Sequence, residues 1–172
     1  PRLFVVDTRA ASAVDLGCAY DLAVDERGRT LLGVTSGAVS LEGKGRAAYV
    51  PRGAHVVADP DRGPGTVVAD SASPELRAAI ERLDAGDAAA LPEVLVRARP
   101  SDSVTLWSVL LGASPETRGS VFNRMDQLGL RPVSVQREAV IAKQPETLNV
   151  WRTSLENQWF SPPQGRAPSD AG

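Results

Sequence analysis

The feature that most constrains this chain is a stretch from residue 14 to residue 57, in which apolar residues alternate with small or polar ones. In its first block the apolar residues occupy every even position, which is the period of a half-buried β-strand. They are Val14, Leu16, Cys18, Tyr20, Leu22 and Val24. Similar blocks follow at residues 32–41 and 49–57. The stretch predicts a compact β region built from short strands.

The strands expected from this pattern are 3–6, 13–24, 31–35, 38–41, 47–50, 54–58 and, last and short, 66–68. The run 3–6 is continuously apolar, which predicts a strand buried on both faces. At Ser36-Gly37 the apolar positions change from even to odd, and such a change at a glycine indicates a bulge or a corner. Residues 59–65 predict a loop. A sandwich, a jelly roll and a short solenoid all remain compatible with strands of this length.

The second half of the chain carries helix signals. A Ser-Pro-Glu start occurs at Ser73 and again at Ser114, placing an N-cap serine before a proline of the first turn. The helices expected are 74–84, 88–97 with Pro92 as a candidate break, 103–111 capped by Ser101 and Asp102, 115–128, 136–143 and 145–159. Their apolar stripes predict a bundle whose core contains Trp107, Trp151 and Trp159, rather than an aromatic binding platform.

These patterns together predict an α+β fold. Residues 1–70 form an all-β domain, residues 71–160 an α-helical bundle, and residues 161–172 a disordered tail rich in Pro, Gly and Ser. The glycines that punctuate the three β blocks, Gly17, Gly37 and Gly53, are expected to determine the fold rather than to contact a ligand.

Composition excludes some functional classes. The net charge is -2, from 19 basic and 21 acidic residues, which disfavours broad binding to nucleic acid. One cysteine rules out an intrachain disulfide, and Cys18 is expected to be a small core residue. No run of about twenty apolar residues and no signal peptide is present. Because the chain starts at Pro1 and enters a strand at once, we expect a fragment of a longer protein.

The sequence predicts no catalytic, cofactor-binding or metal-binding residues and no enzymatic activity. His55 is the only histidine, and we expect it at a strand end in solvent. The segment Gly63-Pro64-Gly65 lacks the lysine and the hydroxyl residue of a phosphate loop. Asp59, Asp61 and Asp70 lack the spacing of an EF-hand, so an acidic turn is the expected structure rather than a calcium site.

The three β blocks resemble the FecR domain, the periplasmic β domain of bacterial transmembrane regulators of extracytoplasmic-function sigma factors. Its patterns V-x-G-T-x-F-x-V, V-x-x-G-x-V-x-V and L-x-x-G-x-x-V are similar to residues 14–22, 34–41 and 50–56, in that order. The likeness covers about residues 3–58, and Cys18 stands where the family often has threonine. Some FecR-domain proteins also carry a helical extension with T-L-W-x-x-L and R-x-x-V-x-x-R, which here are residues 105–110 and 118–124.

The resemblance implies a location on the periplasmic or extracytoplasmic side of a bacterial inner membrane. It implies a cytoplasmic anti-sigma segment and one membrane span upstream of Pro1, a sigma factor bound through that upstream part, and an envelope protein as a second partner. Membrane contact would occur only through the upstream span, and no direct contact with nucleic acid is expected. The alternative is a structural or adhesive cell-envelope module that self-associates through exposed strand edges of the β domain.

Overall fold

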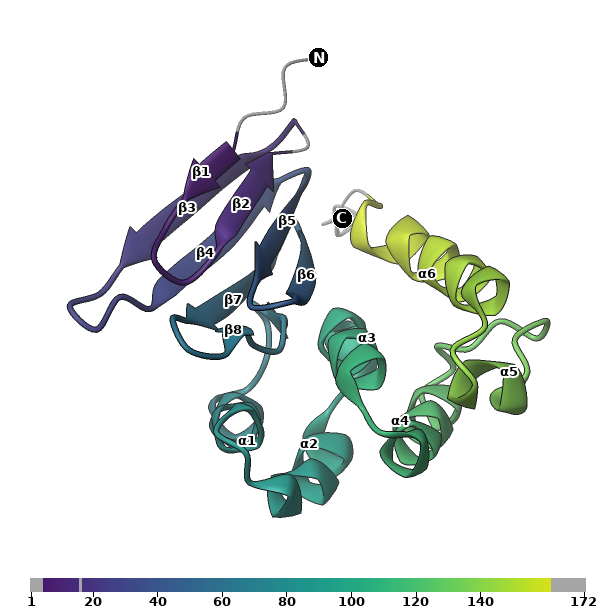
Figure 1. Ribbon diagram of the computed structural model, residues 1–172. Coiled ribbons are helices and arrows are strands. Elements are labelled where there is room, and N and C mark those ends of the chain that lie inside the picture. Colours follow the sequence, from purple (N-terminus) through teal and green to yellow (C-terminus); the bar gives the residue numbers. More distant parts are fainter. Residues whose placement is uncertain (1–4, 16, 162–172) are drawn as a thin grey trace, which may run out of the picture.

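The computed structural model describes residues 5–15 and 17–161 (Figure 1). Two antiparallel sheets form the first half of the chain and helices form the second, so the expected α+β fold with an N-terminal β region is confirmed. Residues 162–172, on which nearly all of the expected tail falls, lie outside the described residues, as do Leu3 and Phe4 of the first expected strand.

One sheet has the strand order β1-β2-β5-β6 and the other β3-β4-β7-β8, with β9 also pairing with β7. The strands are β1 (Val5–Asp7), β2 (Ser12–Asp15), β3 (Ala19–Val24), β4 (Thr30–Ser36), β5 (Ala38–Gly43), β6 (Arg46–Pro51), β7 (Ala54–Asp59), β8 (Gly63–Pro64) and β9 (Val68–Ala69). β8 lies within the segment expected to be a loop, and β9 begins two residues later than the last expected strand. Both are two-residue strands that exist through pairing with β7, which local patterns do not reveal.

The single strand expected over residues 13–24 is wrong, because the chain divides it into β2 and β3, which belong to different sheets. The division lies at Gly17, whose φ of 90° turns the chain. The same happens at Gly37, where β4 ends and β5 begins in the other sheet, so the expected corner is present. Since β2 pairs with β5 and β3 with β4, these four strands form one long hairpin bent across its middle.

The two bends lie against each other. Gly37 has a φ of 71°, and a Cβ atom placed on it would lie 2.9 Å from Cys18 Cβ and 3.0 Å from the Gly17 carbonyl oxygen. The next turn joins them, because Arg52 N–H donates to the Gly37 carbonyl at 2.9 Å and Gly53 N–H donates to the Val34 carbonyl at 2.8 Å. The three glycine-punctuated blocks therefore turn at one common place, which we call the corner.

Between the two sheets lies an apolar core. Its central members are Ala13, Leu32, Val34, Val39, Leu41, Val50 and Val56, drawn from both sheets. β1 does not share in this burial: Val5 is 55% exposed and Val6 38%. The expectation that this first strand is buried on both faces is wrong, because β1 is the outermost strand of its sheet and pairs only with β2.

Most helices begin where the sequence signals them, but the one expected over 88–97 begins only at residue 91, and the one expected over 136–143 spans only 137–141. They are α1 (Pro74–Asp84), α2 (Leu91–Arg97), α3 (Ser103–Gly112), α4 (Pro115–Gln127), α5 (Arg137–Ile141) and α6 (Pro145–Trp159), with short 3₁₀ turns at Ala88–Ala90 and Pro100–Asp102. Ser73 and Ser114 cap α1 and α4, accepting the N–H groups of Leu76 and Thr117. Asp102 stands at the expected N-cap position of α3, but its side chain makes no such bond to the helix; its Oδ2 atom accepts the Arg99 N–H at 2.9 Å instead.

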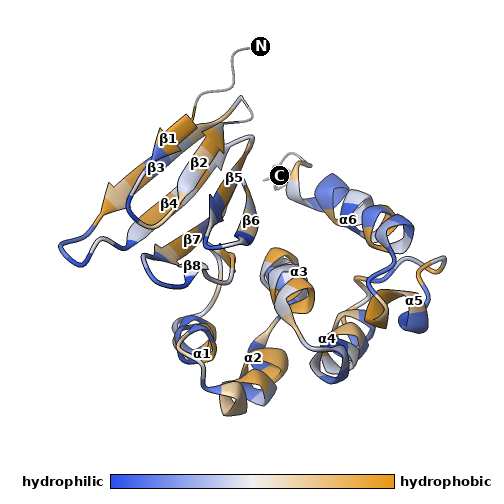
Figure 2. Cartoon of the chain, viewed as in Figure 1, coloured by the Kyte–Doolittle hydropathy of each residue, from blue (hydrophilic) through white to orange (hydrophobic). Residues whose placement is uncertain are grey.

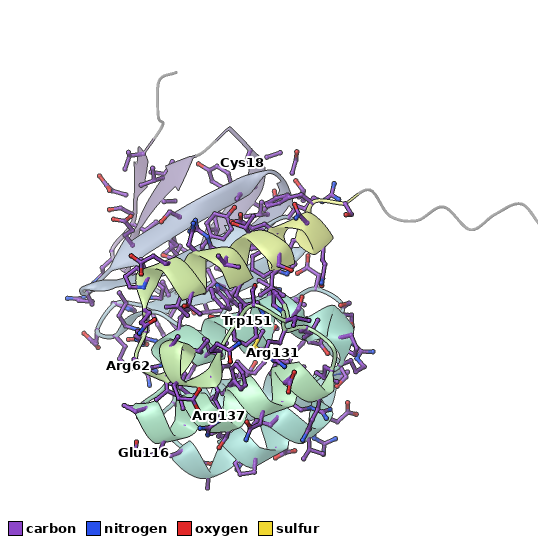
Figure 3. All side chains as sticks on the ribbon, turned by 90° about the vertical axis from the view of Figure 1, so that its right-hand side faces the viewer. Cys18, Arg62, Glu116, Arg131, Arg137 and Trp151 are labelled. Atoms are coloured by element: carbon purple, nitrogen blue, oxygen red, sulfur yellow. The ribbon has the colours of Figure 1, made fainter. Side chains whose placement is uncertain are left out.

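Tryptophans form the centre of the helical core, as expected. Trp151 is fully buried and meets Trp107 and Phe122 edge to face, with ring centroids 5.7 and 5.5 Å apart. Its indole N–H donates to the Leu130 carbonyl at 2.7 Å. Figure 3 shows Trp151 within the helical half, far from Cys18 in the β half. Trp159 is half-buried, and its indole N–H donates to Ser103 Oγ at 3.0 Å.

Two arginines of α4 hold the ends of other helices. Arg118 is buried and donates to the carbonyls of Leu110, Ala113 and Ile141, at the C-terminal ends of α3 and α5. Arg124 donates to the carbonyls of Val96 and Ala98 at the end of α2. The last carbonyls of a helix lack partners within it and carry partial negative charge, so guanidinium groups stabilise them. The R-x-x-V-x-x-R pattern thus has a structural role in this chain.

Hydroxyl groups of α3 join the two halves. Ser108 Oγ accepts the Val67 N–H at 2.9 Å, and Thr105 Oγ1 accepts the buried Ala69 N–H at 3.0 Å. These two side chains, three residues apart on one helix face, satisfy backbone donors at β9 that no further strand satisfies. At the other end, Asp84 of α1 accepts both the N–H and the hydroxyl of Thr66, at 2.9 and 2.7 Å.

The corner predicts unequal effects of adding a methyl group to two glycines of similar φ. Gly37→Ala should lower the free energy of unfolding by about 1–2 kcal/mol for the left-handed backbone and by a further ~1–3 kcal/mol for crowding against Cys18. Gly45→Ala, at φ 70° with open space around it, should carry only the backbone cost. Urea denaturation of both variants measures the difference, and equal losses would contradict close packing at the corner.

The joint between the halves predicts a second effect. Thr105→Val keeps the shape of the side chain but leaves the Ala69 N–H without its acceptor, which should cost about 1–3 kcal/mol of unfolding free energy. The same substitution at Thr153, which is exposed on α6, should change stability by less than about 0.5 kcal/mol. Thermal and urea unfolding compare the two, and a negligible loss in Thr105→Val would show that the bond does not hold the joint.

Candidate functional site

A groove of about 420 Å³ lies where β7, the β8–β9 segment and α1 meet. In Figure 3 Arg62, one of its residues, lies at the boundary between the β half and the helices. Its floor and walls are formed by Arg29, Arg46, His55, Val57, Asp59, Arg62, Gly63, Gly65, Thr66, Val68, Arg77, Ile80, Glu81, Asp84 and Ala85. The groove is therefore built jointly by the two halves of the chain, and it mixes apolar side chains with charges of both signs.

His55 lines this groove and differs from its expected position. It is the second residue of β7, opposite Gly33 of β4 and Val68 of β9, and its side chain is only 23% exposed. Its Nδ1 atom lies 2.7 Å from Asp70 Oδ1. The expectation that this histidine lies in solvent at a strand end is wrong. Because β9 pairs with β7, Asp70, the residue after β9, lies within hydrogen-bond distance of the His55 ring. No local pattern signals that pairing.

The backbone around Asp70 is fixed on both sides. Its N–H donates to the Gly53 carbonyl at 2.9 Å, and its carbonyl accepts Arg77 Nη2 at 2.5 Å. Arg77 also donates to the Ala72 carbonyl at 3.1 Å, so this guanidinium ties α1 to the linker that precedes it. The His55–Asp70 pair thus connects the corner, β7 and the start of α1 through consecutive hydrogen bonds.

The pair has a defined chemical capacity. A carboxylate at Nδ1 favours the tautomer with the proton on that nitrogen, which leaves Nε2 as the acceptor. General base catalysis on this ring would also need a nucleophile within reach. Thr66 is the hydroxyl residue that lines the groove, and its hydroxyl already donates to Asp84. That hydroxyl is therefore already engaged within the groove.

The charges of the groove are partly paired. Arg62 lies 3.6 Å from Asp59 and donates to the Asp84 carbonyl at 3.0 Å. The Asp61 N–H bound to Asp59 holds the pKa of that carboxyl below its usual value, and the Arg62 N–H and side chain lower it further. The side chains of Arg46 and Glu81 have no hydrogen bond or ion pair to any residue that the structure describes, so these two charges are available to a partner.

The acidic residues of this region do not gather into a metal site. Asp59 accepts the backbone N–H groups of Asp61 and Arg62, as an acidic turn does, and Asp70 is held by His55. Within residues 5–15 and 17–161, no three His, Cys, Asp or Glu side chains are placed to hold an ion. Among the helices of that same part, none has the length and apolarity needed to cross a membrane.

Comparison with protein-family models, with curated proteins and with solved structures finds no match for this chain.

Asp59 predicts a pH dependence of stability. Because folding lowers its pKa, its contribution is present above the pKa of the unfolded carboxyl and is lost as pH falls through the folded value. Asp59→Asn should therefore reduce the urea midpoint at pH 7 and flatten its decline between about pH 5 and pH 3. Asp61→Asn removes the same charge from an exposed side chain nearby and is the matched control. Parallel slopes in Asp59→Asn and the unaltered protein would contradict this assignment.

Proposed function

We propose that this chain is the extracytoplasmic part of a FecR-type regulator, which controls an extracytoplasmic-function sigma factor through protein–protein contacts and not through catalysis. The observation that carries the proposal is the groove shared by the β half and α1. A protein segment bound there contacts elements of both halves at once. Binding can therefore change how the halves hold each other, which is what a signal-transmitting domain requires.

The sequence likeness supports the same proposal. It covers residues 3–58, which hold the three blocks that turn at the corner, and it continues into the helical extension. In that extension Thr105 and Arg118 belong to the two recurring patterns, and both bind backbone groups of neighbouring elements. The pattern residues thus stabilise a β domain joined to helices, which is the arrangement expected for a FecR-type protein with such an extension.

The groove has the chemistry of a peptide-binding surface. Val57, which is 43% exposed, offers apolar contact, while Arg46 and Glu81 offer unpaired charges of opposite sign on its two sides. A partner segment with one apolar anchor and flanking charges matches this distribution. In the proposed mechanism such a segment, from an envelope protein, contacts Arg77 of α1 and His55 of β7. The resulting shift of α1 relative to β7 is transmitted to the sigma-factor-binding part upstream.

The exposed edge of β1 favours the second candidate, a self-assembling envelope module. Val5 and Val6 point to opposite faces of an outermost strand and are both exposed. Edges of this kind promote pairing between copies. Light scattering that rises with protein concentration would favour this alternative.

A reporter experiment tests the regulator proposal. The complete gene, with its natural upstream region, is expressed with the neighbouring sigma factor and a promoter that this sigma factor reads. Deleting the region for residues 5–161 should change reporter output severalfold, and Arg46→Glu with Glu81→Lys should reproduce part of that change. Glu138→Lys, an exposed residue of α5, is the matched control and should leave output unaltered. An upstream region without a membrane span, or unchanged output after the deletion, would refute the proposal.

A further inference from the structure

Three turns of the β half meet at one end of the sandwich (Figure 1). They join β1 to β2 (residues 8–11), β3 to β4 (residues 25–29) and β7 to β8 (residues 60–62). The buried Thr30, at the start of β4, donates its hydroxyl hydrogen to Thr8 Oγ1 at 2.8 Å. A Cβ atom placed on Gly28 would lie 3.2 Å from Arg9 Cδ and 3.4 Å from Pro60 Cγ. Turns that are far apart in the sequence are therefore closely packed here.

A hollow of about 350 Å³ lies among these turns, and its lining is rich in arginine. Each turn contributes at least one of the four, which are Arg9, Arg27, Arg29 and Arg62. The other lining residues are Asp59, Pro60 and Asp61. Figure 2 shows hydrophilic colouring on the β3–β4 and β7–β8 turns. We call this place the arginine hollow, and its lining suits a charged ligand rather than an apolar one.

Two of the four guanidinium groups have aspartate partners. Arg29 Nε lies 2.7 Å from Asp25 Oδ2, within the β3–β4 turn. Arg62 Nη2 lies 3.6 Å from Asp59 Oδ2, at the β7–β8 turn. Asp59 also accepts the N–H groups of Asp61 and Arg62, so its carboxylate is engaged by the turn. These pairs stabilise the two turns and balance two of the four positive charges of the hollow.

The other two arginines are free. The side chains of Arg9 and Arg27 have no hydrogen bond or ion pair with any residue that the structure describes, and both residues are exposed. The carboxylate of Asp61 likewise has no partner within the described part of the chain. Two free positive charges thus stand against one free negative charge, and this balance favours an anionic ligand.

The positions of the free arginines favour a phosphate group over a carboxylate. A guanidinium group binds either anion through two parallel hydrogen bonds. A carboxylate has two oxygens in one plane, whereas a phosphate has oxygens in several directions and carries more charge. Arg9 belongs to the β1–β2 turn and Arg27 to the β3–β4 turn, so they reach the hollow from separate elements. A tetrahedral anion can accept hydrogen bonds from both at once.

We propose that the arginine hollow binds a phosphate group, with Arg9 and Arg27 donating to its oxygens. The phosphate is either free in solution or part of a lipid headgroup, since both sources present the same oxygens. The inference goes beyond the proposed regulator role and does not rest on it. Three residues line both this hollow and the groove at α1: Arg29, Asp59 and Arg62. Arg9 and Arg27 belong to the hollow and not to the groove, so variants of these two test it separately.

Isothermal titration calorimetry with sodium phosphate, near neutral pH and at constant ionic strength, tests the proposal on the whole chain. Arg9→Gln and Arg27→Gln should each raise the Kd about tenfold, because each removes a charge-assisted pair of hydrogen bonds. Asp61→Asn should lower the Kd several-fold, and misfolding cannot produce such a gain. Arg152→Gln, which removes one positive charge from an exposed side chain of α6, is the matched control and should leave the Kd unchanged.

Sedimentation with vesicles distinguishes the two sources of phosphate. Binding to phosphatidylglycerol vesicles, absent with phosphatidylcholine and lost in Arg9→Gln, would support the proposal and assign the phosphate to a lipid headgroup. Binding of sodium phosphate without binding to vesicles would support it and assign the phosphate to a soluble ligand.

Three results would overturn the proposal. The first is that neither sodium phosphate nor the vesicles bind, and the second is that Arg9→Gln and Arg27→Gln bind as tightly as Arg152→Gln. The third is a glutamate peptide that binds more tightly than phosphate and loses affinity in Arg9→Gln, which would make the ligand an acidic protein segment. None of these readouts involves the sigma-factor reporter, so failure of this site and failure of the regulator role are distinguishable.

Discussion

The bend in the long hairpin, where Gly17 and Gly37 lie against each other, is the constraint on which the rest of the structure depends. Two strands leave one sheet and enter the other at the same level, so a single hairpin supplies both layers of the sandwich. Each glycine has a positive φ, and the contact between them leaves no room for a side chain on Gly37. The turn at Gly53 then attaches to the same place through Arg52 and Val34. From there β7 and β9 bring His55 and Asp70 together.

Polar side chains that bind backbone groups hold the helical half to this sandwich. Thr105 and Ser108 accept N–H groups beside β9, while Arg118 and Arg124 donate to the carbonyl ends of three helices. Arg52, next to the corner, donates to the Trp159 carbonyl at the end of α6. Each bond satisfies a backbone group that regular secondary structure leaves without a partner. Residues that recur in the helical patterns therefore serve architecture, and binding is left to surfaces between and beside the elements.

The surface with functional potential lies where the two halves of the chain meet. The groove at α1 combines apolar contact with paired and unpaired charges, and both halves of the chain contribute to it. A partner at this surface would contact the joint between the halves.

The sequence by itself determined the local structure: the α+β order, the turns at Gly37 and Gly53, and the helix starts at Ser73 and Ser114. These depend on periodicity, backbone freedom and capping, which act within a few residues. Tertiary structure alone decided that residues 13–24 divide between two sheets, that Val5 and Val6 stay exposed, and that His55 binds Asp70. Period two reports that one face of a strand is apolar, but not which sheet the strand joins or what covers that face. Those outcomes depend on pairing between distant residues, and so does the candidate site.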